Sequence, residues 1–535
     1  MTRFTPARSV RAGLWVVAAS AAVALLLVSP AVGAPPQVAC DDRTNNTYDK
    51  LLECVRLEGV RAHQAAFQAI ATANGGTRAA DTPGYDASVD YVVETLEAAG
   101  WSVELDQFDF TVAQPIVQHT PIEATYESAG VTGSGLGTVT ALVVPVDINL
   151  VPPRANSSGC DGAFTQGPLT TDPIVPHPEG TNDFAGFPSG AIALIQRGTC
   201  SFALKVANAQ AAGAGAVILF NQGNTTAPDR NNVLNATAVP PPSSSVTITI
   251  PAVGASFATG QALAAQPNTT ATVSVVNRPQ VNVVAELDGN NDDNVVMAGA
   301  HLDSVPEGPG INDNGSGSAA LLELAEQLAK LKPENTLRFA WWGAEEEGLV
   351  GSTAYVNGLS QAERDRIALY LNFDMVGSPN YIFMVYDADE SSFDAPVTIP
   401  PGSAAIEDVF ESFYTVMDEP YDDTAFSGRS DYQAFINNGI PAGGLFTGAE
   451  QQKTAEQVTI WGGTAGAQFD PCYHQACDTF ANNNDHALDV NADAIAFAVL
   501  TYAYSTETVN GVPGKRVPGA FTIPAPAGPE GTFIP

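Results

Sequence analysis

The chain has 535 residues, of which 45% are hydrophobic and 8% aromatic, so it can form more than one domain with well-filled cores. With 22 Lys and Arg against 58 Asp and Glu, its formal net charge is −36. Such an acidic chain repels phosphates, which argues against nucleic acid as a partner and against stable association with an anionic membrane.

The first 34 residues are predicted to be an export signal. Arg3, Arg8 and Arg11 precede an apolar run over residues 12–28, and small residues follow up to Ala34, where cleavage is expected. The competing interpretation is a retained membrane anchor, because the run is slightly long for a signal. No basic stop-transfer cluster follows it, so we expect a secreted, extracellular protein.

Six cysteines form three local pairs, which are Cys40 with Cys54, Cys160 with Cys200, and Cys472 with Cys477. An even count in a chain that reaches an oxidising space predicts three disulfides, although other pairings are formally open. The alternative of a cysteine-rich zinc site lacks any CxxC pair.

Residues 47–100 are predicted to be mostly helical, and the segment after Gly100 is predicted to be a strand. Within DASVDYVVETLEAAGW, one helical face carries Val89, Val92, Val93, Leu96 and Ala99. Gly100 is a typical helix end, and SVELDQFDF then alternates like a strand. The first part of the chain thus changes from helix to sheet at Gly100.

Residues 134–276 have a different texture, with frequent Pro and Gly and short strands. Residues 190–222 indicate a strand, a helix over 202–212, a Gly break and a second strand, a unit with its own core. Because no ionisable cluster suitable for catalysis lies there, we expect a small β-rich α/β accessory domain inserted into another domain. Its pattern resembles the protease-associated domain of several exported or membrane-bound peptidases; the alternative is a decorated part of one large domain.

From residue 281 onward strands and helices alternate. The strands are DNVVMAGAH, TLRFAWW and ALYLNFD, and the helices are SGSAALLELAEQLAKL and residues 487–504. This order predicts an α/β fold with a mostly parallel, mixed sheet flanked by helices. We expect residues 40–133 and 277–507 to form the catalytic domain, and the Pro- and Gly-rich residues 508–535 to form an extended tail.

Polar residues gather where these apolar strands end, which is where ligands bind in such sheets. The residues are His301, Asp303, Asp313, Glu345, Glu346 and Asp374, with His474 in the loop between two cysteines. Each alone has an ordinary explanation as a capped histidine, a turn residue or a solvated helix start. Their recurrence at successive strand ends instead favours two zinc ions, with one glutamate of the row binding metal and its neighbour moving a proton.

Several strings closely resemble the secreted double-zinc aminopeptidases of actinobacteria over essentially the whole catalytic domain. They include NGGTRAADTPGYDASVDYV, GAHLDSVPEGPGINDNGSGSAA, LRFAWWGAEEEGLVGS, LNFDMVGSPN, GRSDYQAF, GGLFTG and WGGTAGAQFDPCYHQACD. The resemblance implies the zinc exopeptidase fold and two zinc ions per chain. The implied ligands are His301 and Asp374 for the first ion, Glu346 and His474 for the second, and Asp313 bridging both.

The same resemblance implies the other roles. Asp303 would orient the ring of His301, Glu345 would be the general base, and Tyr473 would donate a hydrogen bond to the developing oxyanion. The implied substrate pocket comprises Met375, Gly428, Arg429 and Phe446. The implied reaction is release of N-terminal, large apolar, Leu-like residues from peptides with a free N-terminus, through attack of a metal-bridging water, by a monomer.

The chain departs from the common family pattern at two positions. Glu347 has no matching acid in the usual GAEELG motif and is expected to be surface charge, and Tyr432 replaces the His of GRSDH, which affects loop packing or selectivity. Relatives also bind calcium, and Asp489 and Asp493 match two of its ligands; the alternative is two solvent-facing acids.

Three rival functions stay open at this point. A carboxypeptidase for acidic C-terminal residues would want basic side chains around the substrate carboxylate, and the strings offer only Arg429. A glutaminyl cyclase on the same fold would use one zinc ion. A non-catalytic binding protein would have lost metal ligands, whereas every ligand position is filled here.

Overall fold

The computed structural model describes residues 40, 42–166, 174–176, 182–241 and 244–529. The predicted export signal at 1–34 lies outside the described residues. No described helix has the length and apolarity that crossing a bilayer requires.

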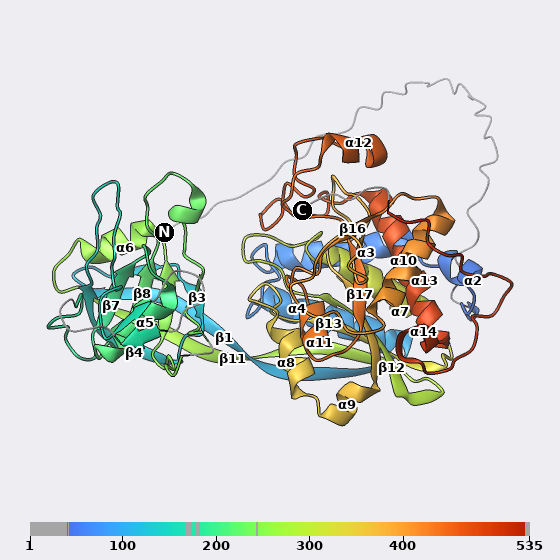
Figure 1. Cartoon of the computed structure of the whole chain (residues 1–535), viewed down its shortest axis with the longest axis horizontal. Coiled ribbons are helices and arrows are strands. Elements are labelled where there is room, and N and C mark those ends of the chain that lie inside the picture. The colour runs from blue at the N-terminus through green and yellow to red at the C-terminus, as the bar shows by residue number, and fades with distance from the viewer. Residues whose placement is uncertain (1–39, 41, 167–173, 177–181, 242–243, 530–535) are drawn as a thin grey trace, which may run out of the picture. The chain divides into compact units, whose positions relative to one another are not determined.

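A mixed sheet forms the centre of the catalytic part, as predicted (Figure 1). Its parallel middle has the order β13, β12, β14, β17, with bounds Asn335–Trp342, Asn291–His301, Ile367–Phe373 and Ala442–Phe446. Three further strands follow at the two sides: β15 (Met384–Tyr386) antiparallel to β17, β16 (Asp422–Thr424) parallel to β15, and β11 (Thr270–Leu287) antiparallel to β13. The carboxyl ends of the four middle strands therefore meet at one edge.

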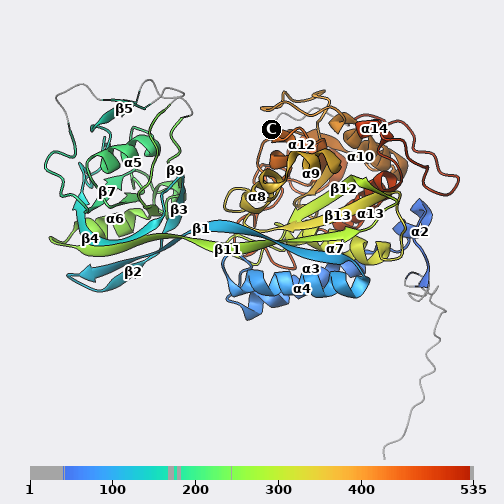
Figure 2. The ribbon, with the colours of Figure 1, turned by 90° about the horizontal axis from the view of Figure 1, so that it is seen from below.

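Helices cover both faces of this sheet because its strands are apolar on both sides. In β13, Phe339 and Trp341 pack into one core, and Ala340 and Trp342 pack into the other. The first core includes side chains of α3 (Leu57–Ala73), α4 (Pro83–Ala99), α7 (Gly315–Leu328), α10 (Ser403–Met417) and α13 (Asp485–Tyr504). The second includes side chains of α8 (Val350–Gly358) and α11 (Tyr432–Asn437), and Figure 2 shows α4 and α8 on opposite sides of β12 and β13.

The predicted helix before Gly100 is α4. Its buried side includes Val89, Val92 and Leu96, and Gly100 ends it in the left-handed conformation with φ 88°. That conformation is accessible to glycine at little steric cost, which explains why the helix stops there. The predicted strand that follows is β1, Ser102–Thr120.

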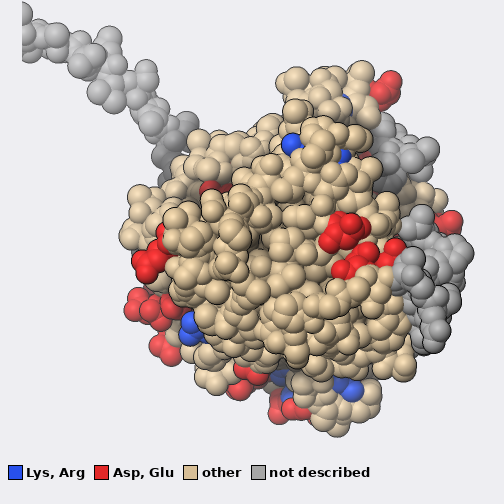
Figure 3. Space-filling view, turned by 90° about the vertical axis from the view of Figure 1, so that its left-hand side faces the viewer, with Lys and Arg blue, Asp and Glu red and all other residues tan. Residues whose placement is uncertain are grey.

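The inserted domain is built on four parallel strands. They are β4 (Gly137–Pro145), β7 (Ile192–Gln196), β8 (Ala216–Phe220) and β10 (Ala252–Ala255), with helices α5 (Phe202–Ala211) and α6 (Phe257–Ala264). The strand, helix and strand predicted within residues 190–222 are β7, α5 and β8. Two strands before the expected start at residue 134, β2 (Ala124–Tyr126) and β3 (Ala129–Thr132), pair with β1 and β10 respectively. Figure 3 views the molecule from the left-hand side of Figure 1, and most of the surface on that face belongs to residues other than Lys, Arg, Asp and Glu.

Strands β1 and β11 form a long antiparallel ribbon that belongs to both parts of the chain. The β11 strand pairs with β4 through residues 270–275 and with β13 through residues 283–287. The two cores of the catalytic part contain no residue from 112–276 among the described residues. Each part therefore has its own core, and Val112 of the ribbon packs on a small cluster with Phe108, Phe110 and Ala344.

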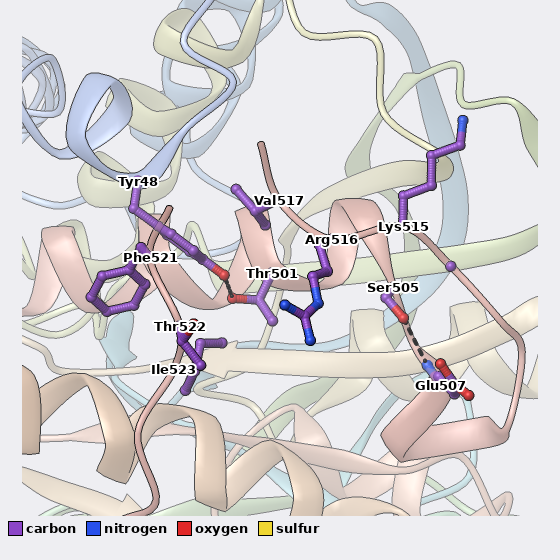
Figure 4. Close-up of a pocket in the computed structure, with 11 residues that line it drawn as sticks. Tyr48, Thr501, Ser505, Glu507, Lys515, Arg516, Val517, Phe521, Thr522 and Ile523 are labelled. Atoms are coloured by element: carbon purple, nitrogen blue, oxygen red, sulfur yellow. Dashed lines mark hydrogen bonds between the residues drawn. The ribbon is translucent and has the colours of Figure 1, made fainter. Parts of the chain in front are cut away.

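The C-terminal segment has no helix or strand beyond α14 (Glu507–Asn510) among the residues described, but it packs against the catalytic part. The ring of Phe521 lies 5.2 Å from that of Tyr48, whose hydroxyl is 2.9 Å from Thr501 Oγ1 (Figure 4). These side chains line a cavity of about 310 Å³. The predicted tail is thus irregular but docked.

Disulfides connect Cys160 with Cys200 and Cys472 with Cys477, as predicted. Cys40 and Cys54 are each disulfide-bonded as well, and no described cysteine is free.

Candidate metal centre

Three parallel strands bring predicted site residues to one edge of the sheet. His301 is the last residue of β12, Glu345 and Glu346 follow the end of β13, and Asp374 follows β14. Parallel strands share the direction of their carboxyl ends, so side chains far apart in sequence become neighbours. Asp313 precedes α7 and points to the same place.

Five of these side chains form two triads that share Asp313. His301 Nε2 lies 3.2 Å from Asp313 Oδ1 and 3.4 Å from Asp374 Oδ1. His474 Nε2 lies 3.3 Å from Asp313 Oδ2 and 3.0 Å from Glu346 Oε2. One ligand atom from each member of a triad lies within 4.8 Å of the others, and imidazole with carboxylate is a typical zinc ligand set.

Two carboxylate oxygens in these triads are suited to bind a cation because no group in the described chain donates a hydrogen bond to them. Glu346 Oε1 and Asp374 Oδ1 are buried and have no hydrogen-bond partner. Leaving a buried carboxylate oxygen unpartnered is costly, whereas a metal ion would coordinate it. The residues present therefore fit a metal pair.

Burial and the charges of neighbouring groups shift the pKa values of these side chains. Burial, and then the charge of Asp313, raises the pKa of Glu346 to about 8. Burial also raises the pKa of Asp313, but hydrogen bonds with His301 and His474 outweigh it and lower that pKa below its ordinary range. The shared aspartate is thus held ionised between two imidazoles.

Asp303 contacts both the ring of His301 and the backbone of the turn after β13. The ring Nδ1 lies 3.1 Å from the backbone oxygen of Asp303 and 3.7 Å from its carboxylate Oδ1. That carboxylate accepts hydrogen bonds from the backbone N–H groups of Glu345, at 3.1 Å, and Glu346, at 3.3 Å. Asp303 consequently connects the end of β12 to the turn after β13.

Asp478 and Ser430 support the centre although the sequence analysis gave them no role. The Asp478 carboxylate accepts hydrogen bonds from the backbone N–H groups of Asn312, at 2.8 Å, and Asp313, at 3.0 Å. Ser430 Oγ donates to Asp374 Oδ2 at 2.6 Å. Both lie inside the strings CYHQACD and GRSDY, so their position beside ligand residues was the available signal.

Arg78 supports the loop after β12. Its side chain is fully buried, and its guanidinium donates to the carbonyl oxygens of Pro309, at 2.8 Å, and Gly310, at 2.6 Å. Burial of the charge lowers the pKa of Arg78 to about 10. Asp313 follows this loop, so Arg78 fixes the path of the chain towards the shared ligand.

A cavity of about 140 Å³ opens beside the two triads. Of the predicted pocket residues, Met375, Arg429 and Phe446 line it, as do Glu345 and Tyr473. Gly428 is absent from its lining; its N–H donates to the hydroxyl of the buried Tyr432 at 2.8 Å. Lining residues that the sequence analysis did not identify include Tyr386, Thr424 and Ala425.

Arg429 and Tyr473 are hydrogen-bonded to each other at the rim of this cavity. The guanidinium of Arg429 donates to the Tyr473 hydroxyl oxygen at 3.1 Å and to Glu450 Oε1 at 2.7 Å. Because the oxygen of Tyr473 accepts this bond, its own hydrogen is available for another acceptor.

The remaining predicted positions belong to neither triad. Glu347 is exposed. Asp489 and Asp493 lie on α13, and burial followed by the charge of Asp489 raises the pKa of Asp493 to about 7. Among the described residues, neither belongs to a group of three His, Cys, Asp or Glu side chains with metal-ligand spacing.

Comparison with known proteins identifies the chain's relatives. Residues 282–499 match Peptidase family M28, and residues 146–263 match the PA domain. An aminopeptidase of Pseudomonas aeruginosa is 46% identical over 477 residues, which cover 86% of this chain and 83% of that protein. Leucine aminopeptidase 2 of Arthroderma otae is 36% identical over 528 residues, 96% of this chain and 97% of that protein.

A third relative and one solved structure agree with these matches. The probable lipoprotein aminopeptidase LpqL of Mycobacterium tuberculosis is 42% identical over 469 residues, covering 86% of this chain and 87% of that protein. The structure of an aminopeptidase from Aneurinibacillus sp. strain AM-1 has a TM-score of 0.53 and 27% identity, covering 90% of this chain and 98% of that one. With relatives this similar over most of its length, the chain belongs to peptidase family M28 and carries an inserted PA domain.

Proposed function

We propose that the chain is a zinc-dependent aminopeptidase that binds two zinc ions. It would release N-terminal residues from peptides with a free N-terminus, with a preference for large apolar residues such as Leu. The observation that carries this proposal is the pair of His and carboxylate triads that share Asp313 beside a cavity. Relatives named aminopeptidase and leucine aminopeptidase support it.

The zinc ligands follow from the two triads. His301 and Asp374 would hold one ion, Glu346 and His474 the other, and Asp313 both. When bound, the ions supply a Lewis acid that polarises the scissile carbonyl and activates water at neutral pH. Ser430 and Asp478 keep the carboxylate of Asp374 and the backbone of Asp313 in position.

Glu345 is the proposed general base. Its side chain lines the cavity, and its Oε2 lies 3.9 Å from His301 Nε2. From there it would take the proton of the attacking water and later deliver it to the leaving amine. The Tyr473 hydroxyl, held by Arg429, would donate its free hydrogen to the oxyanion.

The lining of the cavity favours a substrate with a large apolar N-terminal residue. Met375, Tyr386, Ala425 and Phe446 give it apolar walls, and Glu345 is a carboxylate of the lining that is not a proposed zinc ligand and can face the ammonium group. A carboxypeptidase needs a cation for the substrate carboxylate. The one Arg that lines this cavity is already hydrogen-bonded to Glu450, so the lining disfavours that rival.

The test compares hydrolysis of leucyl-p-nitroanilide with that of its N-acetylated twin by the zinc-loaded chain. We expect cleavage of the free amine alone, its loss with a chelator, and about two zinc ions per chain. A single zinc with no hydrolysis would support a cyclase. Full metal content with neither amide hydrolysis nor cyclisation would support a binding role.

Export is proposed from the leader pattern at residues 1–34 and from the disulfides. Expression of the full chain in an actinobacterial host, followed by N-terminal sequencing of protein from the medium, tests it. Cleavage near Ala34 is expected. Recovery only in the membrane fraction with the leader intact would contradict it.

A further inference from the structure

A second cluster of acids lies on three elements next to the catalytic cavity. Glu407 and Glu411 stand one turn apart on α10, Asp423 lies on β16, and Asp387 and Asp389 follow β15. Their oxygens form two triads with ligand spacing, Asp387 with Asp389 and Glu407, and Glu407 with Glu411 and Asp423. The two triads share Glu407, much as the two triads of the metal centre share one aspartate.

The second of these triads is buried and only partly satisfied by the described chain, because Glu407 Oε2 accepts hydrogen bonds from the backbone N–H groups of Ala388, at 2.9 Å, and Asp389, at 3.0 Å, whereas one oxygen of Asp423 has no partner. Glu407, Glu411 and Asp423 are 4%, 8% and 4% exposed. Asp423 Oδ1 is buried with no hydrogen-bond partner, although its other oxygen accepts from Ser392 Oγ. Buried charge is normally paired with a cation or a donor, so this oxygen points to a missing ligand.

The surroundings of the triad add negative charge. The charges with the largest effect on Glu411 all belong to carboxylates, namely Asp423, Asp408, Asp389 and Asp387. Burial first, and these charges second, raise the pKa of Glu411 to about 8. Burial raises the pKa of Glu407 to about 9, although hydrogen bonds from the backbone N–H groups of Ala388 and Asp389 oppose the rise. Like charges one helical turn apart also destabilise a helix, so the arrangement costs stability unless a cation is present.

We propose that Glu407, Glu411 and Asp423, with Asp387 and Asp389 beside them, bind a calcium ion. The donors are all carboxylate oxygens, with no imidazole or thiolate, and such a set selects a hard cation rather than zinc. Calcium accepts many carboxylates in flexible geometry, whereas magnesium demands a near-ideal octahedron and keeps most of its waters. The site is separate from Asp489 and Asp493 on α13.

The calcium ion would brace one wall of the catalytic cavity. Tyr386 and Thr424, which line that cavity, are the immediate neighbours of Asp387 and Asp423. The N–H of Asp387 donates to the carbonyl of Thr424 at 2.9 Å, so the two strand ends already join there. The ion would connect this junction to α10.

The experiment measures calcium binding and thermal unfolding of the zinc-saturated protein after free zinc has been removed. Calcium at about 1 mM lies at the weak end of protein calcium sites and is the probe. When calcium exceeds its Kd by about 100-fold, we expect Tm to rise by roughly 3 °C. Equilibrium dialysis of the unaltered chain counts the bound calcium independently.

Four variants locate the site. Glu411→Gln and Asp423→Asn should abolish the calcium-induced shift while zinc content stays unchanged. Asp408→Asn, a matched control, removes a charge from the exposed side of the same helix, and Asp493→Asn removes the other calcium candidate. Both should retain the shift.

Three results would overturn the proposal. They are no calcium binding by the unaltered chain, a shift that survives in Glu411→Gln or Asp423→Asn, and a shift that disappears in Asp493→Asn alone. Because zinc content and hydrolysis are measured separately, failure of the calcium site is distinguishable from failure of the proposed aminopeptidase activity.

Discussion

At the scale of single residues, Asp313 is the side chain of the candidate metal centre whose position must satisfy both triads at once. Its two oxygens face His301 and His474, at 3.2 and 3.3 Å, and its backbone N–H donates to Asp478. A ligand shared by two triads must be fixed on both sides, because a small displacement changes both sets of distances. The hydrogen bond to Asp478 and the buried Arg78 provide that restraint.

The substitution Glu345→Gln tests the proposed general base because Gln has nearly the same size and shape as Glu. The amide cannot accept the proton, so we expect kcat for leucyl-p-nitroanilide to fall by about 10²- to 10⁴-fold. Zinc content and KM should change little because the side chain is not one of the proposed ligands. A variant with full turnover would remove Glu345 from the mechanism; Glu347→Gln, at an exposed position, is the control.

The proposed calcium site predicts a pH dependence at the scale of residues. Burial raises the pKa of Glu407 and Glu411 from 4.5 to about 9 and about 8. A raised carboxyl pKa means that the folded state binds protons more tightly, so without calcium stability falls as pH rises from 4.5 towards these values. Calcium replaces those protons, so the calcium-induced rise in Tm should be larger at about pH 8.5 than at about pH 6.

That comparison is made by calorimetry of the zinc-loaded chain with and without calcium at both pH values. Burial also raises the pKa values of Asp423 and Asp408, so these two acids reinforce the trend. A calcium effect that is independent of pH would contradict it.

At the scale of elements, a short disulfide loop carries two functional side chains. Cys472 and Cys477 are five residues apart in sequence, and between them lie Tyr473 and His474. His474 has a left-handed backbone conformation with φ 55°, which is uncommon for a residue other than glycine. The closed loop therefore helps to hold an unfavourable conformation at a proposed metal ligand.

Removing this disulfide should lower the zinc affinity of the second proposed site more than it lowers the stability of the fold. For the double variant Cys472→Ser and Cys477→Ser, we expect zinc affinity to fall by about 10- to 100-fold, as for other changes that misplace a metal ligand. Titration of zinc against a competing chelator measures this. The matched control, Cys160→Ser with Cys200→Ser in the inserted domain, should leave zinc affinity unchanged.

At the scale of the whole molecule, the ribbon of β1 and β11 gives a natural place to remove the inserted domain. Thr111 and Asn277 are direct partners across this ribbon, and Thr111 Oγ1 donates to Asn277 Oδ1 at 2.9 Å. None of the described residues in 112–276 belongs to the two catalytic cores described above. A two-residue turn can therefore replace residues 112–276.

We expect the chain with Asn-Gly in place of residues 112–276 to fold as a hairpin at this point and to retain hydrolysis of leucyl-p-nitroanilide. If the inserted domain restricts access, cleavage of long peptides relative to short ones should increase. The measurement compares rates for peptides of increasing length with those of the full chain. An unchanged length preference would contradict a gating role.

Much of the fold and the candidate site was predictable because its signals are local. Gly100 ends α4, and strand periodicity predicted β12, β13 and β14 together with the polar residues at their ends. The strings around His301 and Asp374 then resembled one family. The sequence analysis missed Tyr386 and Thr424 in the cavity because their short strands, β15 and β16, carry no strong periodic signal.

The sequence by itself determined the family and predicted the chemical type of the proposed metal ligands, since strand ends and turn residues depend on neighbours along the chain. Only the tertiary structure decided that Glu407 and Glu411 are buried against Asp423. One helical turn apart, the two glutamates are typical of a solvated helix face. Their burial depends on how α10 packs beside β15 and β16, and contacts between segments distant in sequence leave no local signal.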